Sequence, residues 1–191
     1  FAPENVFYAN QRHVEIDQIN LNLSSLEWWR LCPTCQHMEN LEIHADSHGS
    51  CPRCGDPMWA NISQKRQLLR FKQAIANSND TEVRIDDSAE DREPKFYVRQ
   101  MLGDFERQNI KEAYRLKAPD TPFGFEFIEQ VVFRDVNFGE PTKPGEPYAV
   151  AGQQKPRPGF KLCKYCGQIQ RAPRTERERT QSQFHAFDCE K

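Results

Sequence analysis

Hydrophobic and polar residues alternate along the stretch from Val14 to Leu23, which reads Val-Glu-Ile-Asp-Gln-Ile-Asn-Leu-Asn-Leu. An alternation with a period of two predicts a β-strand that turns one face toward a core, and the spacing becomes irregular near its end. A different pattern occupies residues 62–76, where hydrophobic residues are grouped among lysines and arginines. This second pattern predicts a helix.

A second alternating stretch lies further along the chain. Phe123, Phe125 and Phe127 are separated by small or charged residues, and valines and another phenylalanine follow. Aromatic and β-branched residues at this spacing predict an antiparallel β-meander over residues 114–138, with a buried aromatic face. The apolar stretch before it, residues 96–105, fits either a strand or a short helix.

Two stretches carry no hydrophobic period. Residues 77–93 are acidic and rich in Asn, Ser and Asp, and residues 139–159 are rich in proline and glycine. Both compositions predict loops or linkers. The whole chain is 37% hydrophobic and 28% charged, which argues against one large core and favours small modules stabilised by metal.

The chain shows no targeting or membrane signal. It has neither a signal peptide nor an apolar run long enough to cross a bilayer. Its first residue is Phe1 rather than methionine, so we expect a piece of a longer polypeptide, located in the bacterial cytoplasm without membrane contact.

Seven cysteines and one histidine divide into two complete sets of four metal ligands. The first set is two Cys-x-x-Cys pairs separated by fifteen residues: Cys32, Cys35, Cys51 and Cys54. Paired turns at this spacing are typical of a structural zinc site, with the intervening residues 36–50 forming a short hairpin of a zinc ribbon. A disulfide framework would leave one of seven thiols over, and iron–sulfur sites usually place three cysteines close together. The histidines in between (His37, His44 and His48) are expected on the hairpin surface.

The second set consists of Cys163, Cys166, His185 and Cys189. His185 and Cys189 have the i, i+4 spacing that places two side chains on one helical face. Two structural Zn²⁺ ions are therefore predicted. The alternative for the second set is a solvated His185 with an uncoordinated Cys189.

These assignments give the predicted organisation: α+β, β-rich, with a zinc-ribbon module, antiparallel strands and a second small zinc module. The predicted segments are a zinc ribbon with flanking strand and helix (1–76), an acidic linker (77–95), a β-meander (96–140), a Pro/Gly linker (141–159) and a second zinc-binding module (160–191).

Charge is distributed unevenly around a formal net charge of −2. Residues 153–191 hold nine Lys/Arg against four Asp/Glu, whereas residues 1–60 hold eight carboxylates against three arginines. The basic end could follow a phosphate backbone or contact an acidic partner, and the alternative is a solvated loop. The candidate nucleic-acid contacts are Lys155, Arg157, Lys161, Lys164, Arg171, Arg174, Arg177 and Arg179.

No catalytic residue is predicted. The chain lacks phosphate-binding glycine loops and a nucleophile elbow, and neither zinc set has an open position with a nearby general base, which argues against a zinc nuclease or deaminase. Asp86, Asp87, Glu90 and Asp91 are interpreted as an acidic loop rather than a site for a hard cation.

Three features together resemble a known family. They are the segment Trp28-Trp29-Arg30-x-Cys-Pro-x-Cys, the acidic stretch from Ile85 to Pro94, and the closing Cys163-x-x-Cys-Gly turn. The chain resembles the C-terminal cysteine-rich zinc-binding region of DEAD/DEAH-type superfamily 2 DNA helicases. This family includes MrfA/YprA-like repair helicases and the anti-phage helicases of the Druantia and DISARM systems.

The resemblance implies a parent protein that is an ATP-dependent DNA helicase or translocase, active in defence or DNA repair. Its zinc region would brace the upstream motor domains and contact DNA or a partner subunit of a defence complex. His185 departs from an all-cysteine ligand set. The alternative function is a zinc-ribbon module for protein–protein interaction without nucleic-acid contact.

Overall fold

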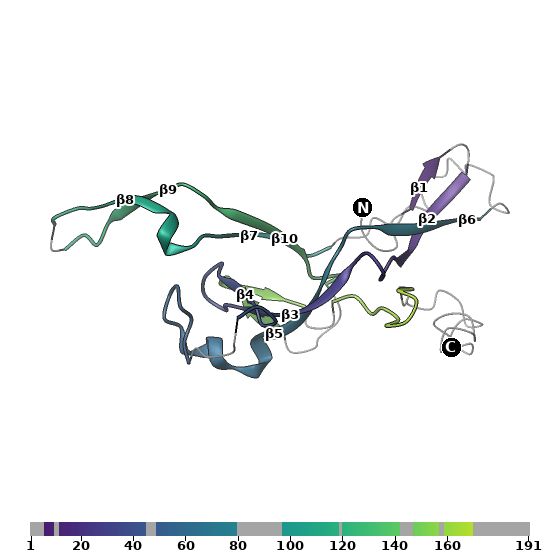
Figure 1. Ribbon diagram of the computed structural model, residues 1–191, viewed down its shortest axis with the longest axis horizontal. Helices are drawn as coiled ribbons and strands as arrows, with labels where there is room; N and C mark the ends of the chain where they lie inside the picture. Colours follow the sequence, from purple (N-terminus) through teal and green to yellow (C-terminus); the bar gives the residue numbers. More distant parts are fainter. Residues whose placement is uncertain are drawn as a thin grey trace.

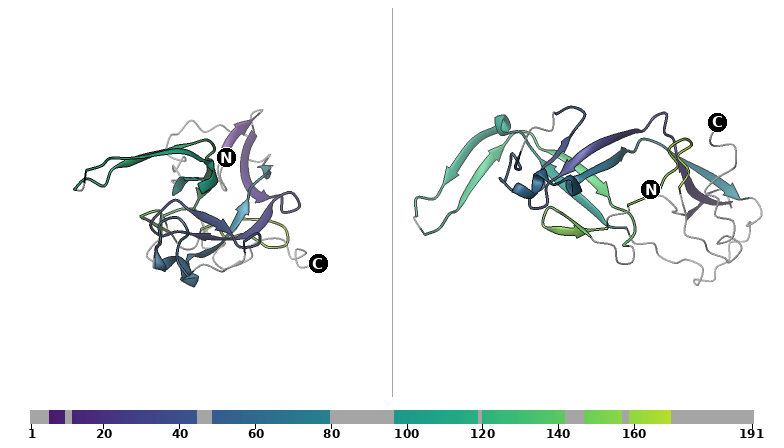
Figure 2. Two further views of the ribbon diagram at one scale, coloured as in Figure 1. Left: turned by 60° about the vertical axis from the view of Figure 1, so that its left-hand side comes forward. Right: turned by 90° about the horizontal axis from the view of Figure 1, so that it is seen from below.

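The computed structural model describes residues 6–9, 12–44, 49–79, 97–118, 120–141, 147–156 and 159–169. These residues form small antiparallel sheets (Figure 1, Figure 2). The strands are β1 (Val6–Ala9), β2 (Arg12–Ile19), β3 (Ser25–Leu31), β4 (Met38–Asn40), β5 (Lys65–Arg70), β6 (Ala74–Asn79), β7 (Arg99–Asp104), β8 (Ile110–Arg115), β9 (Gly124–Ile128), β10 (Val132–Asn137), β11 (Tyr148–Val150) and β12 (Gln153–Lys155). The short 3-10 helices are η1 (Pro57–Ala60), η2 (Ile62–Gln64) and η4 (Arg107–Asn109). The β-rich prediction is confirmed. The described part of the chain contains no α-helix, and none of its helices could cross a membrane.

The first half of the chain is a long, interrupted hairpin. β2 leads into β3 and β5 leads into β6, while β2 pairs with β6 and β3 pairs with β5. At the interruption, the Asn20 N–H donates to the Gln73 carbonyl oxygen at 3.1 Å, which keeps the two sides together. The strand predicted over residues 14–23 is confirmed as far as Ile19, and a turn follows it.

The helix predicted over residues 62–76 is wrong. Only η2 is helical there, and β5 and β6 occupy most of the remainder. The sequence of β5, Lys-Arg-Gln-Leu-Leu-Arg, has favourable helix propensity. However, β5 pairs with β3 over its whole length, and its Leu68 packs against the main core. Cross-strand pairing and packing therefore outweigh the local preference.

The hairpin predicted within residues 36–50 also differs from the structure. β4 pairs with β3, with Leu31 opposite Met38. The first Cys-x-x-Cys turn itself reverses the chain between these strands, so it forms the bend of the hairpin rather than its entrance.

The second half contains another interrupted hairpin. β7 pairs with β10, and β8 pairs with β9. This nested order replaces the predicted meander, because β10 returns to pair with β7 rather than with β9. The outer part, residues 110–128, projects from the rest of the molecule and is called the arm below (Figure 1).

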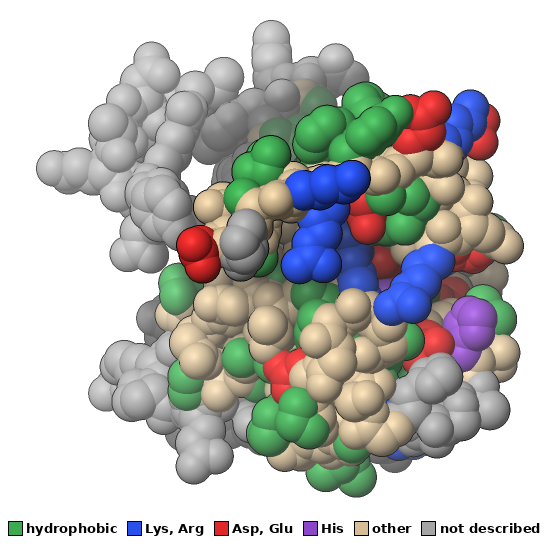
Figure 3. Space-filling model, turned by 90° about the vertical axis from the view of Figure 1, so that its left-hand side faces the viewer, with side chains coloured by type: hydrophobic (Ala, Val, Ile, Leu, Met, Phe, Trp, Pro, Cys, Tyr) green, Lys and Arg blue, Asp and Glu red, His purple; other side chains and the backbone are tan. Residues whose placement is uncertain are grey.

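Phe125 and Phe127 lie in β9, as predicted, and Phe123 directly precedes this strand, but none of the three rings is buried. Phe123, Phe125 and Phe127 are 60%, 51% and 54% exposed. Figure 3, which faces the end that carries the arm, shows hydrophobic side chains at the surface. The buried aromatic face is therefore a wrong prediction. The alternation correctly groups the rings on one face, but none of the described strands forms a layer over this face of the two-stranded ribbon.

The main core lies where three small sheets meet. It includes Leu31 and Met38 from the β3–β4 sheet, Leu102 from β7, and Tyr148 and Val150 from β11. The β11–β12 hairpin thus lies within the predicted 141–159 linker and supplies core residues. Of the predicted acidic linker, residues 77–79 belong to β6 and residues 80–95 lie outside the described residues.

Candidate metal centre

The first cysteine pair lies in the turn that joins β3 to β4. Cys32 directly follows Leu31, the last residue of β3. Its N–H donates to the His37 carbonyl oxygen at 3.0 Å, and the N–H of Cys35 points at the Cys32 Sγ at 3.4 Å. A backbone N–H aimed at sulfur favours the thiolate over the neutral thiol. The turn thus fixes both sulfurs on one side of the chain.

The second cysteine pair forms a similar turn before η1. The Cys51 N–H donates to the Asp56 carbonyl oxygen at 2.9 Å, and the Gly55 N–H donates to the Cys51 carbonyl oxygen at 2.8 Å. Gly55 has φ +79°, a left-handed conformation that glycine adopts without steric cost. The Asp56 carboxylate then caps η1 through the Met58 N–H and accepts a hydrogen bond from the Thr34 hydroxyl of the first turn.

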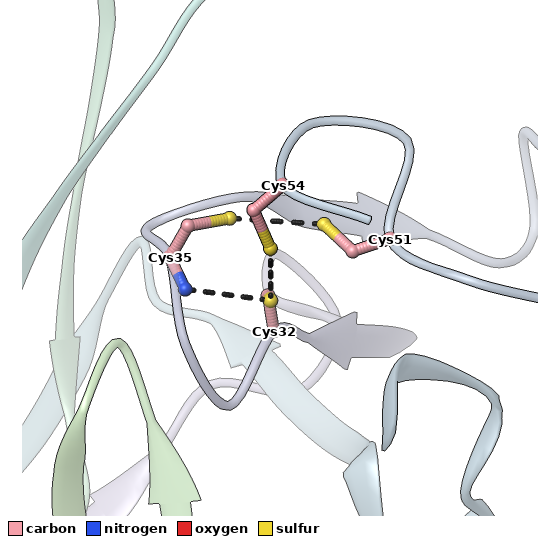
Figure 4. Close-up of side chains that lie close together, drawn as sticks. All are labelled: Cys32, Cys35, Cys51 and Cys54. Atoms are coloured by element: carbon pink, nitrogen blue, oxygen red, sulfur yellow. Dashed lines mark hydrogen bonds between the residues drawn. The ribbon is translucent and has the colours of Figure 1, made fainter. Parts of the chain in front are cut away.

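The two turns bring four sulfurs together, as the sequence predicts (Figure 4). All four Sγ atoms lie within 4.8 Å of one another. Cys32 and Cys54 are separated by 3.6 Å, and Cys35 and Cys51 by 3.7 Å. A tetrahedron with Zn–S bonds of about 2.3 Å has S–S edges of about 3.8 Å, whereas a disulfide needs about 2.05 Å. The spacing therefore fits four ligands of one ion and is consistent with a zinc-ribbon-like site.

The environment of these thiols requires a cation if all four are to ionise. Cys32 and Cys51 are buried. Burial raises the pKa of the Cys35 thiol to about 11 and also raises the pKa of Cys32. At exposed Cys54, slight burial raises the pKa, but hydrogen bonds from the Asp56 N–H and the other thiols lower it overall. A soft divalent cation can displace the remaining protons, because thiolates are its preferred ligands.

A buried tryptophan forms the floor of this cluster. Trp59 of η1 is completely buried and packs against Cys32 and Cys51. The His37 ring lies 5.2 Å from the Trp59 ring, and the Arg30 guanidinium lies 5.6 Å from the Trp59 ring centroid. The cluster thus has its own small apolar core, separate from the main one.

Both turns are tied to the base of the arm through one carboxylate. Asp104, the last residue of β7, is 7% exposed. Its oxygens lie 2.8 Å from His37 Nδ1 and 3.0 Å from Arg53 Nη1. Burial raises the pKa of Asp104, but the hydrogen bond and electrostatic attraction of His37 lower it overall. Ionised Asp104 therefore joins the first turn, the second turn and β7.

The histidines between the cysteine pairs have different positions. His37 is not a surface residue, because its ring is held between Asp104 and Trp59. This corrects the prediction for His37. The His44 side chain is 60% exposed, as predicted, and His48 lies outside the described residues. His37 shows no sequence signal for its role, since Asp104 is 67 positions away.

The β11–β12 hairpin supports the first turn from another side. The Ala151 N–H donates to the Cys32 carbonyl oxygen at 2.9 Å, and the Gly152 N–H donates to the Pro33 carbonyl oxygen at 2.7 Å. These bonds satisfy backbone acceptors beside the ligands.

The third cysteine pair repeats the backbone geometry of the second. The Cys163 N–H donates to the Gln168 carbonyl oxygen at 2.8 Å, and the Gly167 N–H donates to the Cys163 carbonyl oxygen at 2.9 Å. These are the same relative positions as in the turn from Cys51 to Asp56. Cys163 and Cys166 are thus placed in a ligand-type turn, whereas His185 and Cys189 lie outside the described residues.

This third turn is docked on β2. The Ile19 N–H donates to the Gly167 carbonyl oxygen at 2.9 Å, and the Gln18 side-chain amide donates to the Cys166 carbonyl oxygen at 2.6 Å. The Ile169 N–H donates to the backbone carbonyl oxygen of Asp17 at 2.9 Å. Residues almost 150 positions apart in the chain are therefore held together at the N-terminal sheet.

Replacing Gly167 with alanine is expected to undo this docking and to lower the free energy of unfolding by about 2–3 kcal/mol. A Cβ at Gly167 would lie 2.0 Å from the Ile19 carbonyl oxygen, and the residue has φ +76°. Gly152→Ala is a matched control, because Gly152 has φ +75° with open space around it. Urea unfolding of both variants measures the difference. If both variants lost the same free energy of unfolding, backbone strain alone would account for the effect, and the close contact with β2 would contribute nothing.

The candidate nucleic-acid contacts are only partly placed. Lys161 lies just before the third turn and Lys164 lies within it, and both are exposed. Lys155 is 3% exposed, lies over the Phe138 ring and has a pKa lowered by burial. This corrects the prediction for Lys155, which is not accessible to a phosphate. Arg157, Arg171, Arg174, Arg177 and Arg179 lie outside the described residues.

Within the described ranges, the four-cysteine cluster is the one grouping of three or more metal-ligating side chains. The acidic residues Asp86, Asp87, Glu90 and Asp91 lie outside these ranges. Comparison of the chain with protein-family models, curated proteins and solved structures finds no match.

Proposed function

We propose that the chain binds a structural Zn²⁺ ion through Cys32, Cys35, Cys51 and Cys54. The observation that carries this proposal is the clustering of the four sulfurs within 4.8 Å of one another, with distances of 3.6 Å and 3.7 Å between Cys32 and Cys54 and between Cys35 and Cys51. Four protein thiolates leave no position for water or substrate, so the ion has a structural rather than a catalytic role. Its effect is to lock the two turns against each other and, through Asp104, to hold the base of the arm.

A second structural Zn²⁺ is proposed at Cys163, Cys166, His185 and Cys189. Support comes from the hydrogen-bond pattern that the third turn shares with the second, and from the His-x-x-x-Cys spacing that follows it. This ion would join the C-terminal residues to a turn that is already docked on β2.

The metal content of purified protein tests both sites. Two zinc ions per chain are expected, and Cys163→Ser should retain one. The first ion should survive in that variant, because the four-cysteine cluster shares no ligand with the third turn. Elemental analysis together with thiol accessibility gives the readout. A content of one zinc ion per unaltered chain would contradict the second site. A content of no zinc would contradict both sites.

The wider role proposed is that of an accessory region of an ATP-dependent DNA helicase or translocase in anti-phage defence or DNA repair. The support is the pair of ligand sets and the Trp28-Trp29-Arg30 segment before the first set. In this role the zinc-stabilised sheets brace the motor domains, and the basic C-terminal stretch contacts DNA or a partner subunit.

The alternative role is a protein-interaction module without nucleic-acid contact. The exposed arm and the net charge of −2 favour it. A salt titration of DNA binding separates the two roles, because each phosphate contact gives a log–log slope of about −0.7 to −0.9. A steep slope that becomes shallower in an Arg171→Ala/Arg174→Ala variant supports the DNA-contacting role. Absence of binding at low salt supports the alternative.

A further inference from the structure

The arm has one continuous aromatic face. Tyr114 on β8 lies opposite Phe125 on β9, with ring centroids 5.3 Å apart in a stacked arrangement. Phe127 makes edge-on contacts with both, at 6.0 Å from Tyr114 and 5.6 Å from Phe125. Side chains two positions apart on a strand share a face, so Leu116 and Phe123 extend the same surface toward the tip.

Within the described part of the chain, no element packs on this surface as the covering layer that a two-stranded ribbon normally needs. The five side chains of the aromatic face are between 51% and 60% exposed. An isolated two-stranded hairpin is marginal in water, and a third strand or a packed layer usually stabilises it. The rings touch one another but contact no core residue of the main cluster. A partner that covers them would supply the missing layer.

Charge on the arm selects the kind of partner. Arg115 and Lys117 alternate with Tyr114 and Leu116, so they belong to the opposite face. Glu112, which shares the aromatic face by strand alternation, accepts a hydrogen bond from the Tyr114 hydroxyl at 2.7 Å, and Lys111 at the bulge of β8 forms an ion pair with Glu129 at 2.9 Å. Among the described residues of the arm, the basic side chains thus lie on the opposite face or in an ion pair, so a nucleic acid whose bases stacked on these rings would find no unpaired cation beside them for its phosphates. A neutral, apolar surface is the complementary partner.

We propose that this partner is a second copy of the chain, and that two arms pack with their aromatic faces together in a two-fold symmetric dimer. A nearly uncharged surface can face itself without like-charge repulsion, and an isologous contact is the commonest way in which identical chains associate. The arm also projects from the body, so two arms can meet before the bodies do (Figure 1).

The available area is sufficient for a weak dimer. Five half-exposed large side chains offer roughly 100 Å² each, or roughly 1,000 Å² over two copies, which is near the lower limit for specific association. We therefore expect a reversible dimer with a dissociation constant on the order of micromolar rather than an obligate one. This proposal does not depend on DNA binding or on the second zinc ion.

Sedimentation velocity over protein concentrations from about 1 to 200 µM tests the proposal. The unaltered chain should shift from monomer to dimer, and Phe125→Ser/Phe127→Ser should weaken association at least roughly 100-fold, because each altered ring counts twice in a symmetric contact. Ile62→Ser is the matched control, since Ile62 is 80% exposed but lies away from the arm, on η2. The control should dimerise like the unaltered chain.

Zinc content shows whether the body of each variant is folded, because the metal cluster lies outside the arm, and far-ultraviolet circular dichroism shows whether the strands of the arm are retained. A monomer at every concentration, or equal dimerisation of the double variant with normal zinc content, would overturn the proposal. Binding of a single-stranded oligonucleotide that is lost in Phe125→Ser/Phe127→Ser but kept in Ile62→Ser would also overturn it, since the face would then be a base-stacking surface. Failure of the zinc proposal would appear separately, in the metal content of the unaltered chain.

Discussion

Cys54→Ser is expected to release the zinc ion of the first site and to unfold the segment around it. Cys54 is exposed, so its side chain contributes little by packing, and an ordinary surface substitution changes stability by only about 0.5 kcal/mol. As a ligand, however, it completes a site whose apparent binding free energy in small zinc domains is about 10–16 kcal/mol. A serine hydroxyl is a poor replacement for a thiolate on a soft cation.

The measurement is zinc content per chain together with the thermal unfolding curve. One zinc ion fewer and the loss of the cooperative transition of the ribbon are expected. Met58→Ser is the matched control, because Met58 is also exposed and lies in the adjoining η1. The control should keep its zinc and its melting temperature. A Cys54→Ser protein that does the same would contradict the assignment of Cys54 as a ligand.

Trp59→Ala is expected to lower the free energy of unfolding by about 4 kcal/mol, the usual cost of removing a fully buried aromatic ring. Trp59 fills the floor beneath Cys32 and Cys51 and also supports the His37 ring. A cavity there leaves the two cysteine turns without their shared apolar contact. Because folding and metal binding are coupled, zinc affinity should fall as well.

Trp28→Ala serves as the control for residue type, since Trp28 on β3 is 46% exposed. It should cost about 1 kcal/mol or less. Urea unfolding at constant free zinc measures both variants, and competition with a colorimetric chelator measures zinc affinity. If both variants lost similar stability and zinc affinity, the contact of Trp59 with the cysteine turns would not contribute to either.

The ligands of the first site could be identified from the sequence alone. Metal-binding chemistry depends on residue type and on short spacing, and both are local properties. A Cys-x-x-Cys turn places two sulfurs on one side of the chain through backbone hydrogen bonds within six residues, as between Cys51 and Asp56. The same local rule correctly predicted the turn at Cys163.

The surroundings of the site could not be identified in this way. Asp104 joins the two cysteine turns from 67 positions beyond His37, and β11 supports the core from a stretch whose composition indicates a linker. Likewise, β5 has favourable helix propensity but becomes a strand because β3 offers it a partner. These outcomes depend on which segments meet, which local spacing does not encode.

The arm shows most clearly which features follow from local sequence and which depend on tertiary structure. Alternation at Phe123, Phe125 and Phe127 determined by itself that these rings share one face of a strand, because side chains on a strand point alternately to opposite sides. Whether that face is buried depends on the layer placed against it, and β10 pairs with β7 instead of returning over β9. The sequence by itself therefore determined which four cysteines form the cluster and which side chains share a strand face. The tertiary structure decided which faces are covered, because burial is a property of neighbours that are distant in the chain.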